Sequence, residues 1–160
     1  MISQIIDKVI EYNKGDPRRI SHLLKVYSFA KTIGELEKLD EKKQEILEIS
    51  AVLHDIGIHS CEKKHNSTAG HFQEIEGPPI AEEMLKEFNI SQEIIDRVCF
   101  LIGHHHTYSE IDGIDYQILV EADFLVNIYE DNMDESQMTS IRNKIFKTKS
   151  GINIINKMYF

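Results

Sequence analysis

The sequence is poor in residues that interrupt helices and in residues that form covalent cross-links. It has three prolines, eight glycines, two cysteines and no tryptophan among 160 residues. Cys61 and Cys99 lie far apart and neither has a second cysteine beside it, which excludes a zinc-ribbon spacing and a disulfide framework. No apolar run approaches the roughly 18 residues of a membrane span, and the N-terminus lacks a secretory-signal pattern. We therefore expect a cytoplasmic protein with no membrane partner.

Positive charge is also scarce. The chain carries 27 acidic and 18 basic residues, and its net charge is -9. This balance argues against a broad grip on the phosphate backbone of nucleic acid, so we expect no stable nucleic-acid partner. Any phosphate group that binds this chain needs a local positive centre, and a metal ion would supply one.

Apolar residues recur at helical spacing along nearly the whole chain, whereas alternating, strand-like runs are absent. The length suits one domain with one buried core. We therefore predict an all-α fold, a single compact helical bundle over residues 1–160. The expected helices cover residues 2–14, 17–38, 41–56, 77–88, 91–104, 115–130 and 135–148.

Two segments fall outside this helical pattern. Residues 58–76 lack periodic apolar residues, so we predict an irregular segment, with Gly77-Pro78-Pro79 as the first turn of the next helix. Because it follows a His-Asp pair and holds His59, His65 and His71, we expect it to form a mobile rim of the active site. The apolar tail, 152–160, suits docking on the body of the domain or on a second subunit, so a homodimer stays open.

Histidines and aspartates on the inward faces of helices carry the predicted chemistry. Asp123 lies on an apolar helix face, and a buried carboxylate needs an arginine, a helix N-terminus or a metal ion as partner. His22 and the pair His54-Asp55 lie on the inward sides of two further helices, and His104-His105-His106 closes a fourth. Each residue alone is more often structural or exposed. Together they form a ligand set for Fe, Mn, Ni, Co or Zn, which predicts a metal site.

The order of these residues closely resembles the HD-domain superfamily of metal-dependent phosphohydrolases. The resemblance covers about residues 17–130, with the remaining helices, 131–160, expected to pack on that part. It rests on five phrases, in the family's order: Ser21-His22-Leu23-Leu24-Lys25-Val26, Ala51-Val52-Leu53-His54-Asp55-Ile56-Gly57, Glu74-Ile75-Glu76-Gly77, His104-His105, and Glu121-Ala122-Asp123-Phe124-Leu125.

The resemblance implies a metal ion bound by four residues, and Asp55 could bridge to a second ion. The four implied ligands are His22, His54, Asp55 and Asp123.

Further histidines from the middle of the chain would hold the second ion. His104 and His105 match the later of these positions, and His71 is a further candidate. The earlier position departs from the family's pattern, because Gln73 precedes Glu74 where two-metal members tend to carry a histidine. The sequence therefore leaves open whether one or two ions bind.

These observations predict a metal-dependent phosphohydrolase that acts on a small phosphorylated substrate, either a nucleotide or another phosphate ester. In this hypothesis Asp55 and the metal position a hydroxide for in-line attack, while His104 or His105 holds a second ion or protonates the leaving oxygen. The basic side chains of Arg18, Arg19 and Lys25 could bind the substrate phosphate.

Two alternatives stay open. One is a di-iron oxygenase of the same fold, and the other is a non-catalytic nucleotide-sensing module that kept the ligands but lost turnover.

Overall fold

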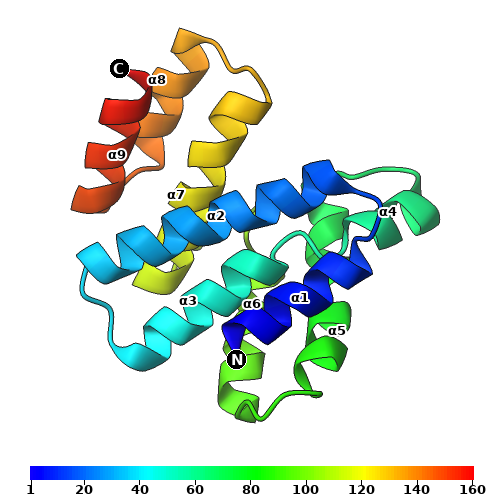
Figure 1. Cartoon of the computed structure of the whole chain (residues 1–160). Helices are drawn as coiled ribbons and strands as arrows, with labels where there is room; N and C mark the ends of the chain where they lie inside the picture. Colours follow the sequence, from blue (N-terminus) through cyan, green and yellow to red (C-terminus); the bar gives the residue numbers. More distant parts are fainter.

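The computed structural model describes all residues, 1–160, as nine α-helices with no β-strand (Figure 1), which confirms the predicted all-α class. None of the helices combines the length and apolar character that crossing a membrane requires. The helices are α1 (Ile2–Tyr12), α2 (Pro17–Leu36), α3 (Glu41–Leu53), α4 (Ile58–His65), α5 (Gly70–Leu85), α6 (Gln92–Ile102), α7 (Ile114–Glu130), α8 (Glu135–Lys144) and α9 (Lys149–Tyr159).

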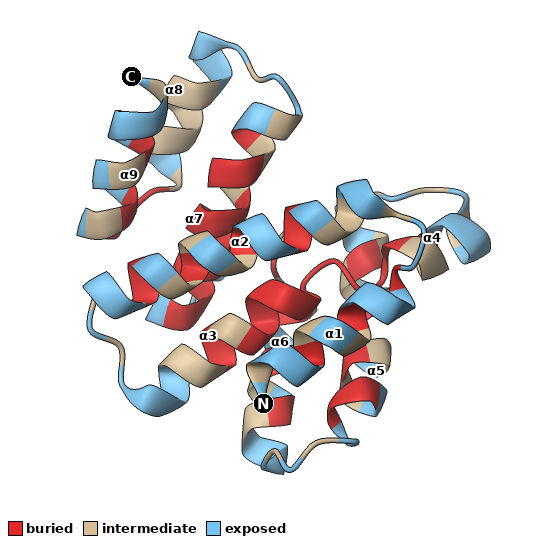
Figure 2. Ribbon diagram, in the orientation of Figure 1, coloured by how far each residue is buried: buried red, intermediate tan, exposed pale blue.

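The core forms where α2 packs against both α3 and α7, with α6 closing on α3. Figure 2 shows buried residues over much of α3 and α7, whereas the outer face of α1 is exposed. Side-chain caps start several of these helices: the carboxylates of Asp16 and Asp40 accept from the backbone N–H of Arg19 and Lys43. Such caps satisfy backbone donors that the helix itself leaves unpaired.

The central helix α7 buries three acidic side chains, Asp115, Glu121 and Asp123. Arg97 neutralises Asp115 through two bonds, with Nε–Oδ2 and Nη2–Oδ1 distances of 2.9 and 2.7 Å. Glu121 is satisfied by hydrogen-bond donors at the start of α9. Asp123 meets only histidines, so it is the one buried acid of α7 that has neither a permanent cation nor backbone and hydroxyl donors beside it.

Glu121 ties the C-terminal helix pair to α7. One carboxylate oxygen accepts from the backbone N–H groups of Lys147 and Thr148 at 3.0 and 3.1 Å, and the other accepts from the Thr148 hydroxyl at 2.6 Å. Thr148 in turn caps α9 by accepting from the Gly151 N–H. The tail is therefore helical and lies on the body of the same chain, beside α7 and α2.

The prediction of an irregular segment over residues 58–76 is wrong. This stretch contains α4 and the first half of α5, which begins at Gly70 and runs through Pro78 and Pro79. A proline inside a helix removes one hydrogen bond to the carbonyl four residues earlier. The two prolines suggested a helix start, but packing of α5 against α4 and α6 outweighs the two lost bonds.

A glycine contact joins α5 to the turn that carries the His54-Asp55 pair. A Cβ atom placed on Gly57 would lie 2.7 Å from the backbone nitrogen and 3.0 Å from the Cα of Gly77. Two backbones therefore touch directly at this point, and only glycine leaves room for them. A Cβ on Gly77 would also lie 2.7 Å from the Ile102 side chain. This contact sets the position of the turn relative to α5 and α6.

We predict that Gly57→Ala lowers the free energy of unfolding by about 2 kcal/mol, because the added methyl group meets rigid backbone. Gly34→Ala is the matched control: its methyl group meets only the movable end of the Gln44 side chain, and alanine favours the helix by up to about 1 kcal/mol. Urea unfolding of both variants measures the difference. Equal stability of the two variants would contradict the role of the glycine contact.

Candidate metal centre

Two histidines present the same ring nitrogen to one point. His54, at the end of α3, has its Nδ1 2.7 Å from the carbonyl oxygen of Ala51. His22, from α2, has its Nδ1 2.5 Å from a carboxylate oxygen of Glu130. Because carbonyl and carboxylate oxygens only accept, both Nδ1 atoms must donate, and each neutral ring then carries its lone pair on Nε2.

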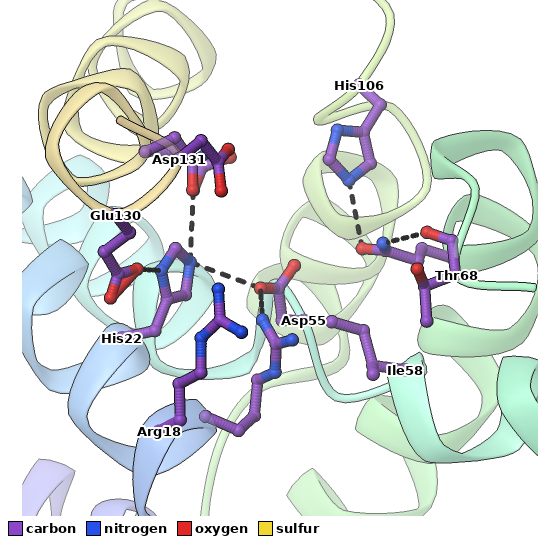
Figure 3. Close-up of a pocket in the computed structure, with 12 residues that line it drawn as sticks. Arg18, His22, Asp55, Ile58, Thr68, His106, Glu130 and Asp131 are labelled. Carbon is purple, nitrogen blue, oxygen red and sulfur yellow. Dashed lines mark hydrogen bonds and ion pairs between the residues drawn. The ribbon is translucent and has the colours of Figure 1, made fainter. Parts of the chain in front are cut away.

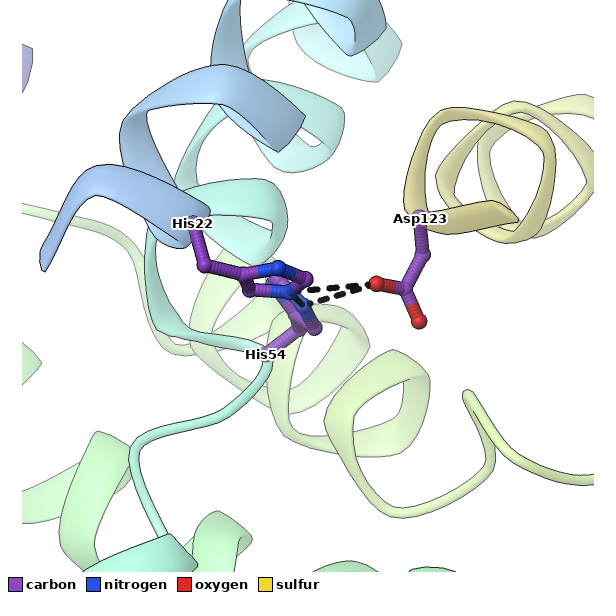
Figure 4. A group of neighbouring side chains, drawn as sticks. All are labelled: His22, His54 and Asp123. Carbon is purple, nitrogen blue, oxygen red and sulfur yellow. Dashed lines mark hydrogen bonds and ion pairs between the residues drawn. The ribbon is translucent and has the colours of Figure 1, made fainter. Parts of the chain in front are cut away.

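These lone pairs converge with a buried carboxylate oxygen. The Nε2 atoms of His22 and His54 lie 3.2 Å apart, and each lies 3.3 Å from Oδ1 of Asp123 (Figure 4). Oδ1 of Asp123 is fully buried and accepts no hydrogen bond within the chain. Three electron-rich atoms at this separation repel one another unless a cation lies among them.

Asp55 extends this cluster from the turn after α3. Its Oδ2 lies 3.2 Å from Nε2 of His22, 3.5 Å from Nε2 of His54 and 3.0 Å from the guanidinium of Arg19. Its Oδ1 faces the other way, 3.5 Å from Nε2 of His105. Asp55 therefore lies between two groups of metal-type donors, His22–His54–Asp123 and Asp55–His105–His106.

The second group is less free to bind a cation. Nδ1 of His105 is 2.7 Å from the carbonyl of Ile102, and its Nε2 is buried with no hydrogen-bond partner. Gln73 donates its amide N–H to the carbonyl of Thr68 at 2.6 Å, so its amide oxygen faces Nε2 of His106 at 3.0 Å. This oxygen can only accept, hence Nε2 of His106 carries the hydrogen.

The electrostatics of the first group also favour a bound cation. Burial lowers the pKa of His22, but the neighbouring carboxylates of Asp123 and Asp55 outweigh it and raise the pKa to about 10. Burial opposes ionisation of both aspartates, yet the histidines hold the pKa of each well below its ordinary value. Burial lowers the pKa of His106 to about 4, assisted by His105. Without a metal ion, the first group therefore binds a proton in its place.

These residues fit a divalent transition metal. They combine imidazole nitrogens, each oriented by a second hydrogen bond, with carboxylate oxygens, as Fe, Mn, Ni, Co and Zn sites require. The orphaned Oδ1 of Asp123 and Nε2 of His105 are the donor atoms that a cation would satisfy. His22, His54, Asp55 and Asp123 would hold it.

A cleft of about 250 Å³ opens beside the donor groups (Figure 3). Its lining is polar except for one residue, Ile58. The lining residues are Arg18, Arg19, His22, Asp55, Ile58, Thr68, Gln73, His106, Asp123, Asn127, Glu130 and Asp131.

Three residues singled out in the sequence lie elsewhere. His104 stacks on Phe100, with ring centroids 4.0 Å apart, and bonds to its carbonyl. His71 is exposed beside Phe72. Lys25 is absent from the cleft lining and lies 2.9 Å from Glu130. The structure does not bring these three to the donor cluster or the cleft wall.

Two residues of the centre were missed in the sequence. His106 belongs to the second donor group, although the sequence analysis gave a specific role only to its two neighbours. Glu130, which orients His22, follows Asp123 by seven residues along α7. That spacing is two helical turns on one face, so helix periodicity could have revealed it.

We predict that metal binding releases protons and strengthens as pH rises. At pH 7 the metal-free centre holds a proton on His22, whose pKa is raised to about 10, and an incoming ion must displace it. Affinity should therefore rise about tenfold per pH unit between about pH 6 and 8. Calorimetric Mn²⁺ titration in buffers of different ionisation enthalpy counts the released protons. A pH-independent affinity would contradict this centre.

Matched histidine variants locate the ion. His22→Ala should lower Mn²⁺ affinity more than about 100-fold, because it removes a ligand rather than an outer partner. His71→Ala should leave it unchanged, since His71 is exposed and outside both groups. The rise in melting temperature on adding Mn²⁺ gives an independent readout. A loss of affinity in His71→Ala would instead support the second-metal role predicted from the sequence.

Comparison with known proteins identifies the family and the fold. No curated protein matches the chain significantly. Its fold is similar to the crystal structure of a predicted HD superfamily hydrolase from an uncultured Thermotogales bacterium, with a TM-score of 0.72 and 23% identity, over 98% of this chain and 84% of that chain. The family model described as HD domain matches residues 19–147. These residues include His22, His54, Asp55 and Asp123, and the chain belongs to the HD domain family.

Proposed function

We propose that this protein is a metal-dependent phosphohydrolase. Family membership and the two donor groups support a metal-dependent hydrolase. The observation that carries the proposal is the convergence of His22 Nε2, His54 Nε2 and Asp123 Oδ1 on one point at the floor of a cleft that two arginines also line. A phosphate ester needs both features, because its charge repels water unless nearby cations neutralise it.

A divalent ion in this centre would neutralise phosphoryl oxygens and lower the pKa of water toward about 7. Side chains of the protein would orient the reacting water. Asp55 lies between the two donor groups and has an oxygen directed at each, so it can orient an attacking water and accept its hydrogen bond. The Arg19 guanidinium, 3.0 Å from Asp55, holds this carboxylate in place.

Arg18 is the residue best placed to bind the substrate phosphate. It lines the cleft and forms no ion pair with any carboxylate, unlike Arg19 and Lys25. Figure 3 shows its side chain reaching up beside His22 and Asp55. The sequence left open whether His104 or His105 protonates the leaving oxygen. We assign this role to His105, because Nε2 of His105 faces Asp55 and lacks any other partner.

We predict that the Mn²⁺-loaded protein releases phosphate from p-nitrophenyl phosphate. His54→Ala should lower kcat/KM more than about 100-fold through loss of the ion. Arg18→Ala should raise KM about tenfold with metal content unchanged, since a bond to a charged group is lost. Cys99→Ser serves as control, because this half-buried thiol lies outside the cleft.

Absence of phosphate release under every tested divalent metal, together with full metal loading, would contradict the hydrolase proposal. Oxygen uptake by an iron-loaded sample would then favour the oxygenase alternative. Tight nucleotide binding without turnover would favour the sensing module.

We also propose that the chain binds one ion tightly. Nε2 of His106 carries the hydrogen that Gln73 accepts, so this nitrogen offers no lone pair to a metal and only Nδ1 of the ring stays available. Elemental analysis and calorimetry should give about one equivalent for the wild type. Gln73→His removes the accepting amide, adds an imidazole and should raise the number toward two.

Gln92→His is the matched control for this variant. It makes the same chemical change at an exposed position on α6, far from the cleft residues, and should leave the stoichiometry unchanged. Two tightly bound ions in the wild type would show that Gln73 does not restrict the second group.

A further inference from the structure

The walls of the cleft restrict which phosphate esters it can accept. Eleven of its twelve lining residues are polar or charged, and no Phe, Tyr or Trp is among them. A nucleobase is commonly held by stacking on an aromatic side chain, worth about 1–3 kcal/mol per base. The volume of about 250 Å³ also lies below the roughly 300–1,000 Å³ of sites that enclose larger organic ligands. Neither the walls nor the size suit a base.

The cleft has a cationic side and a hydrogen-bonding side. Arg18 stands at the start of α2 with no ion-pair partner. Asn127 and Asp131 line the cleft from the C-terminal end of α7, and their side chains form no hydrogen bond or ion pair with the rest of the chain. Figure 3 shows Asp131 on the far side of His22 from Arg18. The two sides therefore offer separate partners to two different parts of a ligand.

The chemistry of Asn127 and Asp131 selects the second part of the ligand. A carboxylate only accepts hydrogen bonds, and an amide both donates and accepts. Hydroxyl groups match this pair, because each hydroxyl donates one bond and accepts others. A carboxylate on the substrate would instead be repelled by Asp131, and an alkyl group would offer neither side chain a hydrogen bond.

We infer that the substrate is a small phosphomonoester of a hydroxylated alcohol, such as a polyol or sugar phosphate. This rests on the proposed phosphohydrolase function. The phosphate lies toward Arg18 and the donor groups, and the hydroxyls bond to Asn127 and Asp131. Hydrolysis breaks the bond between phosphorus and the alcohol oxygen and forms a bond from phosphorus to the oxygen of water. The departing alcohol oxygen takes a proton, and the products are the polyol and inorganic phosphate.

A matched pair of probes tests this inference on the Mn²⁺-loaded full chain. Glycerol 1-phosphate and propyl phosphate have the same carbon chain and differ by two hydroxyl groups; adenosine monophosphate adds a base. Released phosphate measures turnover, and protection against thermal unfolding measures binding without turnover. Glycerol 1-phosphate should exceed both other probes at least about tenfold in kcat/KM, because a site built for hydroxyls discriminates against analogues that lack them.

Variants assign the preference to particular side chains. Asp131→Ala and Asn127→Ala should each reduce the preference for glycerol 1-phosphate over propyl phosphate several-fold, while the metal content stays constant. Glu135→Ala is the control: it removes one exposed carboxylate from the neighbouring helix α8, outside the cleft, and should keep the full preference.

The possible outcomes distinguish a failure of the substrate inference from a failure of the proposed phosphohydrolase function. Equal use of glycerol 1-phosphate and propyl phosphate, a preference for adenosine monophosphate, or binding of neither small ester would overturn the substrate class. Variants that weaken all probes equally would also overturn it, because that result reports a structural role. Preferential protection by glycerol 1-phosphate without phosphate release would sustain the ligand class and overturn the phosphohydrolase proposal.

Discussion

The structure is organised around buried negative charge and lone pairs that need a cation. Asp123, Asp55, His22 and His54 come from three helices and one turn, and their donor atoms lie within about hydrogen-bonding distance of one another. A core of this kind is unfavourable alone, because each ionised carboxylate loses its hydration on burial. The surrounding residues hold it together: Glu130 and the Ala51 carbonyl fix the rings, and Arg19 supplies one permanent positive charge.

Several donors of the centre lie at helix ends, whereas His22 and Asp123 lie within α2 and α7. His54 follows the last residue of α3, Asp55 lies in the turn beyond it, and His105 and His106 lie just after α6. Turns at helix ends let adjacent side chains point in different directions. The direct contact between Gly57 and Gly77 brings the first of these turns against α5, and α5 in turn supplies Gln73 to the second. Glu74, one residue further, accepts from the backbone N–H of His106 and the hydroxyl of Thr107.

The two donor groups differ in which ring nitrogens of their histidines donate a hydrogen bond. His22 and His54 each donate through Nδ1 to an oxygen and expose a lone pair. His106 instead donates its Nε2 hydrogen to the amide oxygen of Gln73. The amide of Gln73 thus occupies one of the nitrogens that the second group could offer to a cation. The cleft outside the two groups contains Arg18, which we propose binds phosphate, and Asn127 and Asp131, which we infer bind hydroxyl groups.

Local sequence signals determined the helical class, most helix boundaries and the kinds of donor at the centre. Caps such as Asp16 and Asp40 act within one turn, and periodicity showed that His22, His54 and Asp123 point inward, so short-range rules sufficed. Tertiary structure alone decided three further matters. Packing made most of residues 58–76 helical and carried α5 through Pro78 and Pro79. It turned His104 onto Phe100 while His105 and His106 face Asp55. It also joined Gln73 to a histidine 33 residues away. Each depends on which surfaces meet across the fold, and no spacing along the chain encodes the direction of side chains in a turn.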